Sequence, residues 1–135
     1  MKLHIQLDDS VNEVEVMDLY RKNNWSAAEK PAQLMAALAN SHCLVTARLE
    51  KQLVGIGNAI SDGHLVVYYP HMLVHPAFHR KGIGKEMMRA MQTKYSGFHQ
   101  QILVADGDAI EFYRSLGFAP VGRTQSMWIY AGSDH

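Results

Sequence analysis

The sequence predicts a single α/β domain (of the α+β kind) in which a mixed, mostly antiparallel sheet of six or seven strands is flanked by four helices. Three observations support this prediction. A chain of 135 residues fits one domain and can bury about two-thirds of the surface of its unfolded chain. Segments with the period of a strand and segments with the period of a helix follow one another along the chain. No repeat, low-complexity stretch or linker interrupts them, so we expect one domain over residues 1–135.

The N-terminal part of the chain predicts one strand and two helices. Residues 2–7 alternate apolar and polar side chains, which is the pattern of a half-buried strand. Ser10, followed three residues later by Glu13, predicts the start of a first helix, because such a pair can satisfy two free amides. Pro31 suits the first turn of a second helix, which we expect to end near Asn40.

The rest of the chain predicts a hairpin and then alternating strands and helices. In order, we expect strands at 42–49 and 52–60 around a turn at Glu50-Lys51, a long strand at 64–75, a helix at 82–95, a strand at 99–105, a helix at 108–116 that ends at Gly117, and two short strands within 118–130. The helix after the long strand carries Ile83, Met87 and Met91 on one face, and this spacing predicts that they pack in the core.

The composition argues against several classes of protein. The chain has 13 Lys and Arg against 13 Asp and Glu, whereas a nucleic-acid partner usually requires a net basic face. Its one cysteine, Cys43, lies in an apolar run, which predicts a buried strand residue. It cannot form a disulfide within the chain, which fits a reducing cytoplasm. No apolar run approaches the roughly 18 residues of a membrane span, and the N-terminus lacks a signal-peptide core. We therefore expect a cytoplasmic protein that binds neither nucleic acid nor membrane.

The most informative segment covers residues 74–85 (VHPAFHRKGIGK). A strand ends at Pro76, a short basic loop follows, and two glycines open a helix. The first amides of a helix have no partner inside it and lie at the positive end of its dipole, which suits a phosphate group. Gly82 and Gly84 would let a ligand approach the backbone closely. A glycine-rich connection with ordinary surface charges explains this segment equally well when it is taken alone.

Two common phosphate-binding motifs are absent from the segment. A dinucleotide fingerprint would need a third glycine at the position of Met87. A Walker loop would need Ser or Thr after Lys85, where the chain has Glu86. The segment therefore predicts an anion site of another kind.

Two motifs resemble those of the GNAT superfamily of N-acetyltransferases. The family pattern for acetyl-CoA binding is Gln or Arg, two residues, Gly, one residue, then Gly or Ala. Residues 79–84 (HRKGIG) match this pattern except at His79, which replaces Gln or Arg. Downstream, residues 108–118 (DAIEFYRSLGF) resemble the late helix of the family, in which Ala-x-x-Phe-Tyr-x-x-x-Gly-Phe recurs. The motifs stand in the family's order with a strand-like segment between them, and the resemblance extends over about residues 42–130.

The resemblance implies acetyl-CoA as the co-substrate. Amides of the glycine loop would bind its pyrophosphate, and backbone groups of the 64–75 strand would bind the pantetheine arm where that strand splays from its 99–105 neighbour in a V. The residues implied in cofactor binding are Met72, Leu73, Val74, His79, Arg80, Lys81, Gly82, Ile83, Gly84, Lys85, Asp106 and Tyr113.

Two of these residues have specific expectations and alternatives. His79 could donate a hydrogen bond to a phosphate oxygen. Asp106 stands where many relatives carry an Asn that contacts the pantetheine, but a turn or cap role explains it equally well. Asp108 is expected to cap the following helix.

The resemblance also implies that Tyr113 is the general acid for the departing thiolate. A phenol is protonated at neutral pH and can donate, although this residue could instead simply pack its helix against the sheet. A general base is harder to assign, because Gln101 occupies a place where relatives often carry Glu. His71 is the best-placed base, since imidazoles titrate near neutral pH, with Tyr69 and His75 as runners-up. The alternative for His71, a hydrogen-bonded histidine that lines the pocket, is slightly favoured.

The resemblance thus implies an N-acetyltransferase that moves an acetyl group from acetyl-CoA to a primary amine by direct attack in a ternary complex. The compact chain has more room for a small-molecule acceptor than for a folded protein. A non-catalytic acyl-CoA-binding sensor or subunit is the alternative within the same fold. No metal is implied, because the eight histidines form no pair at ligand spacing on one helix face. A homodimer through the sheet edge or the C-terminal strands is also compatible with the sequence.

Overall fold

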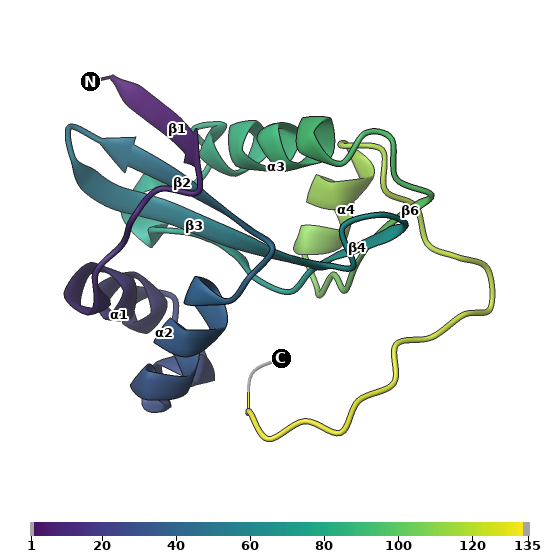
Figure 1. Cartoon of the computed structure of the whole chain (residues 1–135), viewed down its shortest axis with the longest axis horizontal. Helices are drawn as coiled ribbons and strands as arrows, with labels where there is room; N and C mark the ends of the chain where they lie inside the picture. Colours follow the sequence, from purple (N-terminus) through teal and green to yellow (C-terminus); the bar gives the residue numbers. More distant parts are fainter. Residues whose placement is uncertain (1, 134–135) are drawn as a thin grey trace.

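The computed structural model describes residues 2–133. Within this part, six strands form one sheet in the order β1-β2-β3-β4-β6, with β5 also paired to β3, and helices cover both faces (Figure 1). The strands are β1 (Leu3–Leu7), β2 (Cys43–Leu49), β3 (Gln52–Ser61), β4 (Val66–Tyr69), β5 (Met72–Val74) and β6 (Gln100–Leu103). The helices are α1 (Glu13–Lys22), α2 (Pro31–Ala39), α3 (Ile83–Lys94) and α4 (Ala109–Arg114), with short 3-10 turns η1 (Ser26–Glu29) and η2 (Pro76–Phe78). The predicted mixed, mostly antiparallel sheet with four helices is confirmed.

Strands β1, β2 and β3 form an antiparallel half-sheet. The predicted hairpin between β2 and β3 is present, and its turn residues Glu50 and Lys51 have φ angles of +48° and +79°. Two consecutive positive φ angles give a turn whose twist matches that of the flanking strands. Ala47 pairs with Gly55 whereas Arg48 pairs with Leu53, so β3 has one extra residue at this point. This extra residue forms the first of two β-bulges that interrupt β3 pairing.

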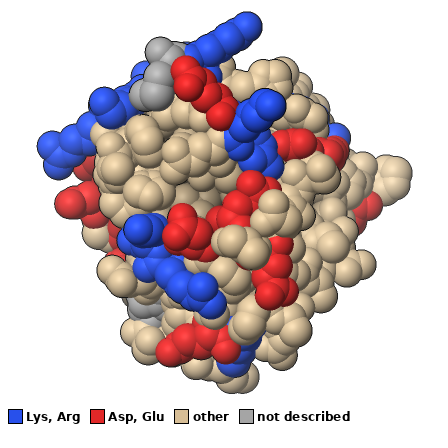
Figure 2. Space-filling view, turned by 90° about the vertical axis from the view of Figure 1, so that its left-hand side faces the viewer, with Lys and Arg blue, Asp and Glu red and all other residues tan. Residues whose placement is uncertain are grey.

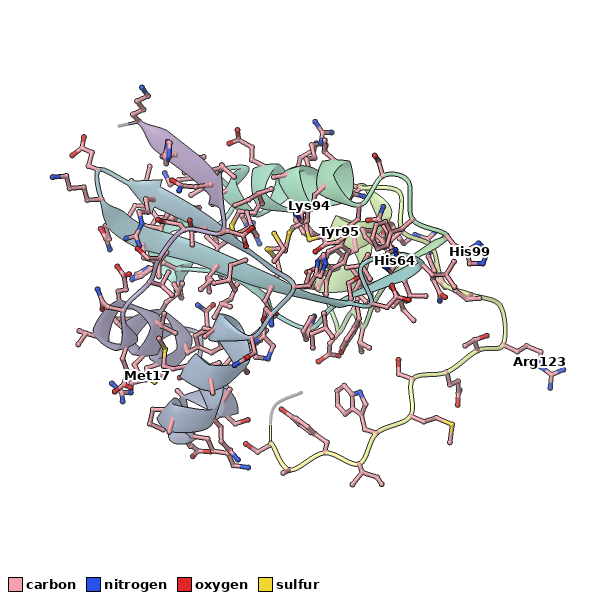
Figure 3. All side chains as sticks on the ribbon, in the orientation of Figure 1. Met17, His64, Lys94, Tyr95, His99 and Arg123 are labelled. Carbon is pink, nitrogen blue, oxygen red and sulfur yellow. The ribbon has the colours of Figure 1, made fainter. Side chains whose placement is uncertain are left out.

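The two faces of the sheet are covered by different helices (Figure 1). α3 packs on one face and buries the predicted apolar stripe, namely Ile83, Met87, Met88 and Met91. α1 and α2 pack on the other face and bury Val16, Met17, Leu19, Tyr20, Leu34 and Leu38. Tyr95 follows α3 and is also buried, while Lys94 beside it lies over its ring at 5.9 Å (Figure 3). The sheet is therefore enclosed between two apolar layers.

The first helix begins at Glu13, and its cap is Asn12 rather than the predicted Ser10. The Asn12 side chain accepts a hydrogen bond from the Glu15 N–H at 2.9 Å, and the Glu15 carboxylate accepts one from the Asn12 N–H at 3.0 Å. The prediction was wrong because the sequence offers the same capping chemistry twice, two residues apart. The Asn12–Glu15 pair forms because Glu15 also binds Arg48 on β2.

Arg48 joins the start of α1 to the β2–β3 hairpin. Its guanidinium donates to Asp9 at 3.0 Å, to the two Glu15 oxygens at 2.9 and 3.0 Å, and to the Ser10 and Lys51 carbonyls at 3.2 and 2.9 Å. These bonds use all five N–H groups of the side chain. Hydrogen bonding to Arg48 lowers the pKa values of Asp9 and Glu15. Ion pairs and hydrogen bonds of Arg48 thus hold the first bulge against the start of α1.

The strand predicted at 64–75 is divided into β4 and β5. β5 pairs Met72 with Gly57, whereas β4 pairs Tyr68 with Ile60. Met72 lies four residues after Tyr68, whereas their partners Gly57 and Ile60 are only three residues apart. The extra residue is a second β-bulge, on the opposite edge of β3 from the first.

Pro70 and His71 form this second bulge. Pro70 has no N–H to donate to a strand ladder, so the pairing is interrupted where the prediction continued it. The buried side chain of Asn58 holds the interruption together. Its Oδ1 accepts from the His71 N–H at 3.0 Å, and its Nδ2 donates to Ser41 Oγ at 2.9 Å. A side-chain amide here replaces backbone pairing.

The C-terminal third differs most from the prediction. β6 and α4 are both shorter than predicted, and Gly117 has a φ angle of +97° after the end of α4. The prediction of two short strands within 118–130 is wrong. Residues 118–133, here named the C-terminal arm, contain no helix or strand and extend away from the sheet, with Arg123 projecting outward (Figures 1 and 3). Apolar alternation predicted strands there, but a strand also requires a neighbouring strand to pair with.

Acidic and basic side chains are interspersed on the face shown in Figure 2. This face therefore presents no continuous patch of one sign. Within residues 2–133, no helix combines the length and apolar character needed to cross a membrane.

Candidate active site

The second bulge opens a fork in the sheet. β4 and β6 run parallel as far as the pair Tyr69–Leu103, after which β5 continues along β3 without pairing to β6. The His71 carbonyl and the His75 N–H both bond to β3. Because bonded and outward-facing residues alternate in an antiparallel pair, the backbone groups of Met72 and Val74 face the fork. This arrangement provides the splay and the unpaired strand edge that the resemblance implies.

Leu73, between these two residues, has a different role. It pairs with Ile56 of β3, and its side chain is buried in the core beneath α1. The backbone groups of Leu73 therefore face β3 rather than the fork.

The glycine loop leads into α3 without a side-chain cap. The N-cap residue Gly82 has a φ angle of +81°, and the first bond of the helix runs from the Glu86 N–H to the Gly82 carbonyl. The amides of residues 83–85 therefore have no partner inside the helix, and they lie at its positive end. Arg80, Lys81 and Lys85 are exposed around them, with Glu86 as the acidic residue of the same turn. This arrangement can bind an anion.

Gly84 brings the two sequence motifs together. A Cβ added to Gly84 would lie 3.4 Å from Cζ of Phe112 on α4 and 3.7 Å from Cγ2 of Val74 on β5. The start of α3, the fork and the late helix therefore meet at one place.

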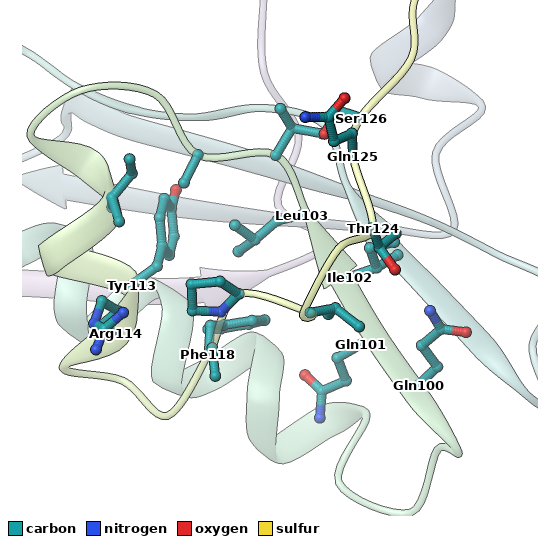
Figure 4. A pocket seen from close by; sticks show the side chains of 16 residues that line it. Gln100, Gln101, Ile102, Leu103, Tyr113, Arg114, Phe118, Thr124, Gln125 and Ser126 are labelled. Carbon is teal, nitrogen blue, oxygen red and sulfur yellow. The ribbon is translucent and has the colours of Figure 1, made fainter.

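Tyr113 lies next to Phe112 on α4 and packs edge-to-face against Phe118. Its ring lines a groove of about 440 Å³ that runs along β6 (Figure 4). Burial raises the pKa of Tyr113 to about 12. The phenol therefore keeps its proton throughout the physiological pH range and can act as a donor.

His71 lies in a separate cavity of about 250 Å³, which it lines with residues of η1 and the C-terminal arm. Its Nδ1 is 2.7 Å from Tyr20 Oη, and its ring meets Trp25 edge-to-face at 5.0 Å. Tyr20 is fully buried, and this burial raises its pKa above the usual range, so the group stays a phenol. A buried hydroxyl requires an acceptor, and Nδ1 of His71 is the acceptor in reach. In that arrangement a neutral His71 carries its proton on Nε2.

A third hollow connects these two sites. It measures about 470 Å³ and shares Val104 and Ala105 with the Tyr113 groove, and Tyr130 with the His71 cavity. Asp106 lines this hollow as well. The structure therefore places Tyr113 and His71 in neighbouring hollows rather than in one pocket.

The side chain of His79 turns back onto the strand before it. Its Nε2 lies 2.7 Å from the Val74 carbonyl oxygen, which can only accept, so Nε2 is the donor. The ring thus ties the glycine loop to β5 instead of extending toward the amides of α3. Asp108 occupies the N-cap position of α4 but makes no side-chain cap bond, so its predicted capping role is wrong; its φ and ψ angles are already helical.

The two alternative bases have other partners. Tyr69 donates to Gln101 Oε1 at 2.7 Å, and burial raises its pKa. Nδ1 of His75 accepts from the Ala77 N–H at 3.1 Å and so caps η2.

Cys43 is fully buried, as predicted, and burial raises the pKa of its thiol to about 11, helped by the nearby Asp8. It is therefore not a nucleophile. Residues 2–133 contain no group of three or more His, Cys, Asp or Glu that could hold a metal ion.

Sequence reasoning missed two residues of the site, Asn58 and Tyr20. Pro70 within a predicted strand is the signal that could have revealed the bulge that Asn58 supports. Nothing local distinguishes Tyr20 from its core neighbours on α1, since its bond to His71 joins residues 51 positions apart.

The profile of the acetyltransferase (GNAT) domain matches residues 39–120, which include the fork, the glycine loop and α4. The chain belongs to the GNAT acetyltransferase family. The resemblance seen in the two motifs is confirmed, and so is the expectation of an acyltransferase. Within the family, the histone acetyltransferase TAP1 of Glycine max is 29% identical over 140 residues, which cover 88% of this chain and 59% of that protein.

Solved structures of GNAT proteins share the fold. The GNAT-family acetyltransferase SP0256 of Streptococcus pneumoniae is 25% identical and superposes with a TM-score of 0.84, covering 96% of this chain and 99% of that one. The aminoglycoside N-acetyltransferase AAC(6')-Iy, solved in complex with CoA, is 16% identical with a TM-score of 0.72, covering 94% of each chain. The second comparison supports the fold alone.

Proposed function

We propose that this GNAT protein transfers the acetyl group of acetyl-CoA to a primary amine of a small molecule, by direct attack of the amine in a ternary complex. The observation that carries the proposal is the meeting, at Gly84, of an uncapped helix start, an unpaired strand edge and the helix of Tyr113. Family membership supplies the reaction class.

The residues present fit acetyl-CoA. The uncapped amides at the start of α3, with Arg80, Lys81 and Lys85 around them, suit a pyrophosphate. The outward backbone groups of Met72 and the N–H of Val74 suit the amides of a pantetheine arm, because an extended ligand can bond to a strand edge as another strand would. The Val74 carbonyl already accepts a hydrogen bond from His79. We assign His79 a positioning role, since its bond to Val74 holds the loop against the strand.

Tyr113 is the proposed general acid. Attack of the neutral amine on the thioester carbonyl forms the C–N bond and breaks the C–S bond. The departing thiolate takes up a proton, and the nitrogen loses one to solvent, from which the acid is reprotonated. Tyr113 can supply that proton because its pKa of about 12 keeps it protonated. His71 is a weaker candidate for the base than the sequence implied. While Tyr20 donates to its Nδ1, the neutral ring offers a hydrogen-bond donor at Nε2, which would orient an acceptor rather than deprotonate it.

The His71 cavity supports a small acceptor. Its volume of about 250 Å³ and its aromatic wall of Trp25, His71 and Tyr130 suit a compact amine. An ammonium group binds well to aromatic faces, and the charges of Glu29 and Lys30 at the same cavity offset each other. An aminoglycoside acetyltransferase with this fold acts on a small molecule, whereas the relative named histone acetyltransferase represents the protein-acceptor class.

Thermal unfolding with and without acetyl-CoA tests the co-substrate. A ligand that binds only the native state adds about 2.7 kcal/mol at 100 times its Kd, so the wild-type Tm should rise by several degrees. Gly84→Glu should abolish this rise by placing a carboxylate among the loop amides. Gly97→Glu is the matched control, because it adds the same charge at the other end of α3 on an exposed glycine with nothing within 4 Å. A rise in Gly84→Glu equal to that of the wild type would contradict the assigned loop.

A panel of amines tests the acceptor. Release of free CoA should be fastest with a small primary amine and slow with lysine-containing peptides. Trp25→Ala should raise KM for the amine with little change in the Kd of acetyl-CoA. Faster turnover of the peptides would assign the chain to the protein-acceptor class.

A further inference from the structure

The helix that carries Tyr113, α4, is only six residues long, and none of these residues is fully buried. Phe112 and Tyr113 pack against the core with part of their surface exposed, and Asp108 makes no side-chain cap bond at the start of the helix. The helix meets the start of α3 where the Phe112 ring lies beside Gly84. A short, partly exposed helix can rotate about one such contact, so a second attachment is needed to fix the direction of the Tyr113 side chain.

The turn that follows α4 is built around the carbonyl oxygen of Tyr113. This oxygen accepts hydrogen bonds from the Leu116 N–H at 3.0 Å and from the Phe118 N–H at 3.1 Å. The Gly117 N–H donates to the Arg114 carbonyl at 3.0 Å, and the φ angle of Gly117 is +97°, so the turn has the bonds of a Schellman motif. The Phe118 ring meets the Tyr113 ring edge-to-face, with centroids 5.9 Å apart, and both line the groove of Figure 4. The conformation of this turn therefore determines where the Tyr113 ring lies.

Gln92 attaches this turn to α3. Its Nε2 donates to the Leu116 carbonyl oxygen at 2.8 Å, and the bond is partly buried. Gln92 follows Gly84 on the same helix by eight residues, a separation of about 12 Å along the helix axis. The two helices are therefore joined at two distant points, by Gly84 with Phe112 and by Gln92 with Leu116.

We propose that Gln92 is a positioning residue for Tyr113 and acts through the turn after α4. Gln92 holds the carbonyl of Leu116, and the N–H of Leu116 bonds to the carbonyl of Tyr113, so a single residue connects the two. The start of α3 is the proposed site of the pyrophosphate, so α3 would set the distance between the bound cofactor and the phenol. This inference rests on the proposed function, in which Tyr113 protonates the departing thiolate. A misplacement of about 1 Å at a reacting group can lower the rate about 10²-fold.

Hydrogen exchange tests the attachment without turnover. Gln92→Glu keeps the size of the side chain but replaces the donor by a carboxylate oxygen, which cannot bond to the Leu116 carbonyl. The amides of Leu116 and Phe118 should then exchange about tenfold faster, because the turn opens more often. Thr93→Glu is the matched control, since it adds the same charge to an exposed position in the same turn of α3, and it should leave this exchange unchanged. Equal exchange rates in the two variants overturn the proposal.

Steady-state kinetics with acetyl-CoA and the fastest amine of the panel tests the effect on the reaction. In Gln92→Glu, kcat should fall about tenfold, while the Kd of acetyl-CoA and the KM for the amine stay within about twofold. Thr93→Glu should keep the wild-type kcat. Gln92→Met is the second variant, because it removes the donor without adding a charge, and its kcat should fall by the same factor. A wild-type kcat in Gln92→Met overturns the proposal.

A double-mutant cycle separates positioning from a purely structural role. The acid is absent in Tyr113→Phe, so adding Gln92→Glu to this variant should lower kcat by less than about twofold. An equal reduction of kcat in both backgrounds overturns the proposal, because Gln92 would then act independently of Tyr113. Full kcat in Tyr113→Phe alone would contradict the proposed acid, and the positioning role with it, even where hydrogen exchange shows that the attachment exists.

Discussion

β3 has a β-bulge on each of its edges, and the two have opposite consequences. On the β2 edge, the bulge beside Arg48 is closed by a guanidinium that bonds to Asp9, Glu15 and two carbonyls. On the other edge, the bulge at Pro70 and His71 divides a strand and opens the fork between β5 and β6.

The difference lies in how the lost pairing is replaced. At the first bulge all five N–H groups of Arg48 have partners within the protein, so this region contributes to stability. At the second, Asn58 satisfies one amide, and the backbone groups of Met72 and Val74 face outward. An irregular strand becomes a binding site only where backbone groups are left available to a ligand.

Arg48→Met should give the largest effect, and on stability alone. Removing one member of a largely buried charge network leaves Asp9 and Glu15 without their partner, and we expect a loss of about 2–3 kcal/mol, discounted for partial exposure. Urea unfolding measures this loss. The Kd of acetyl-CoA should stay within about twofold, because the second bulge is intact; a tenfold weakening would show that the two bulges are coupled.

The pH dependence of stability provides a companion test of the Arg48 network. The pKa values of Asp9 and Glu15 are lowered in the folded state, so their contribution is complete above their unfolded pKa values of about 4. It is lost as pH falls through the lowered folded values. Wild-type stability should therefore decline below pH of about 4, and the decline should be shallower in Arg48→Met. Equal slopes in the two proteins would contradict the assignment.

Tyr113→Phe should produce the opposite pattern, with a large effect on turnover and a small one on stability. We expect kcat to fall about 10²-fold, in the range of general acid catalysis, with the Kd of acetyl-CoA unchanged. Because burial raises the pKa of Tyr113 to about 12, its deprotonation should not reduce wild-type kcat below a pH of about 11. Tyr68→Phe on β4 is the matched control. An unchanged kcat in Tyr113→Phe would remove this residue as the acid.

Asn58→Ala should affect both stability and the site. It leaves the partly buried His71 N–H without its acceptor, which costs about 1–2 kcal/mol, and it releases the bulge that positions the His71 ring. KM for the amine should rise while the Kd of acetyl-CoA changes less. Ser41→Ala removes the other bond of Asn58 and should cost less. Equal effects of the two variants would place the role of Asn58 in packing rather than at the bulge.

Gly82→Ala should have the smallest effect. The φ angle of +81° is unfavourable for alanine by about 1 kcal/mol, although nothing lies within 4 Å of the added Cβ. Chemical denaturation measures the free energy of unfolding of this variant and of Gly97→Ala. Because Gly97 has no positive φ angle, the difference gives the cost of the backbone conformation at Gly82. An equal loss in both variants would show that the positive φ angle of Gly82 is not the cause.

Around the first bulge, the structure agrees closely with the prediction from the sequence, because local sequence patterns determine the elements there. The hairpin turn, the apolar stripe of α3 and the buried Cys43 all lie where alternation and helical spacing predict them. The cap of α1 was misplaced because a distant residue, Arg48, selects between two equivalent local choices.

Around the second bulge, the structure agrees less well with the prediction from the sequence, because contacts between residues far apart in the chain determine the structure there. The hydrogen bonds of His71 with Asn58 and Tyr20 produce no periodic pattern in the sequence. The C-terminal arm has the apolar alternation of a strand but no neighbouring strand to pair with in the described part of the chain. The glycine loop was recognisable because its helix start depends only on neighbouring residues.

The burial of Cys43 has a consequence for an enzyme proposed to release a free thiol at every turnover. A reactive cysteine near the fork would attack the thioester itself, taking the acetyl group and releasing CoA as a thiol. Cys43 lies inside the sheet with a thiol pKa of about 11, so almost none of it is thiolate at neutral pH. The chain is thereby protected from self-acylation, and the intact mass of the protein should stay constant through many cycles.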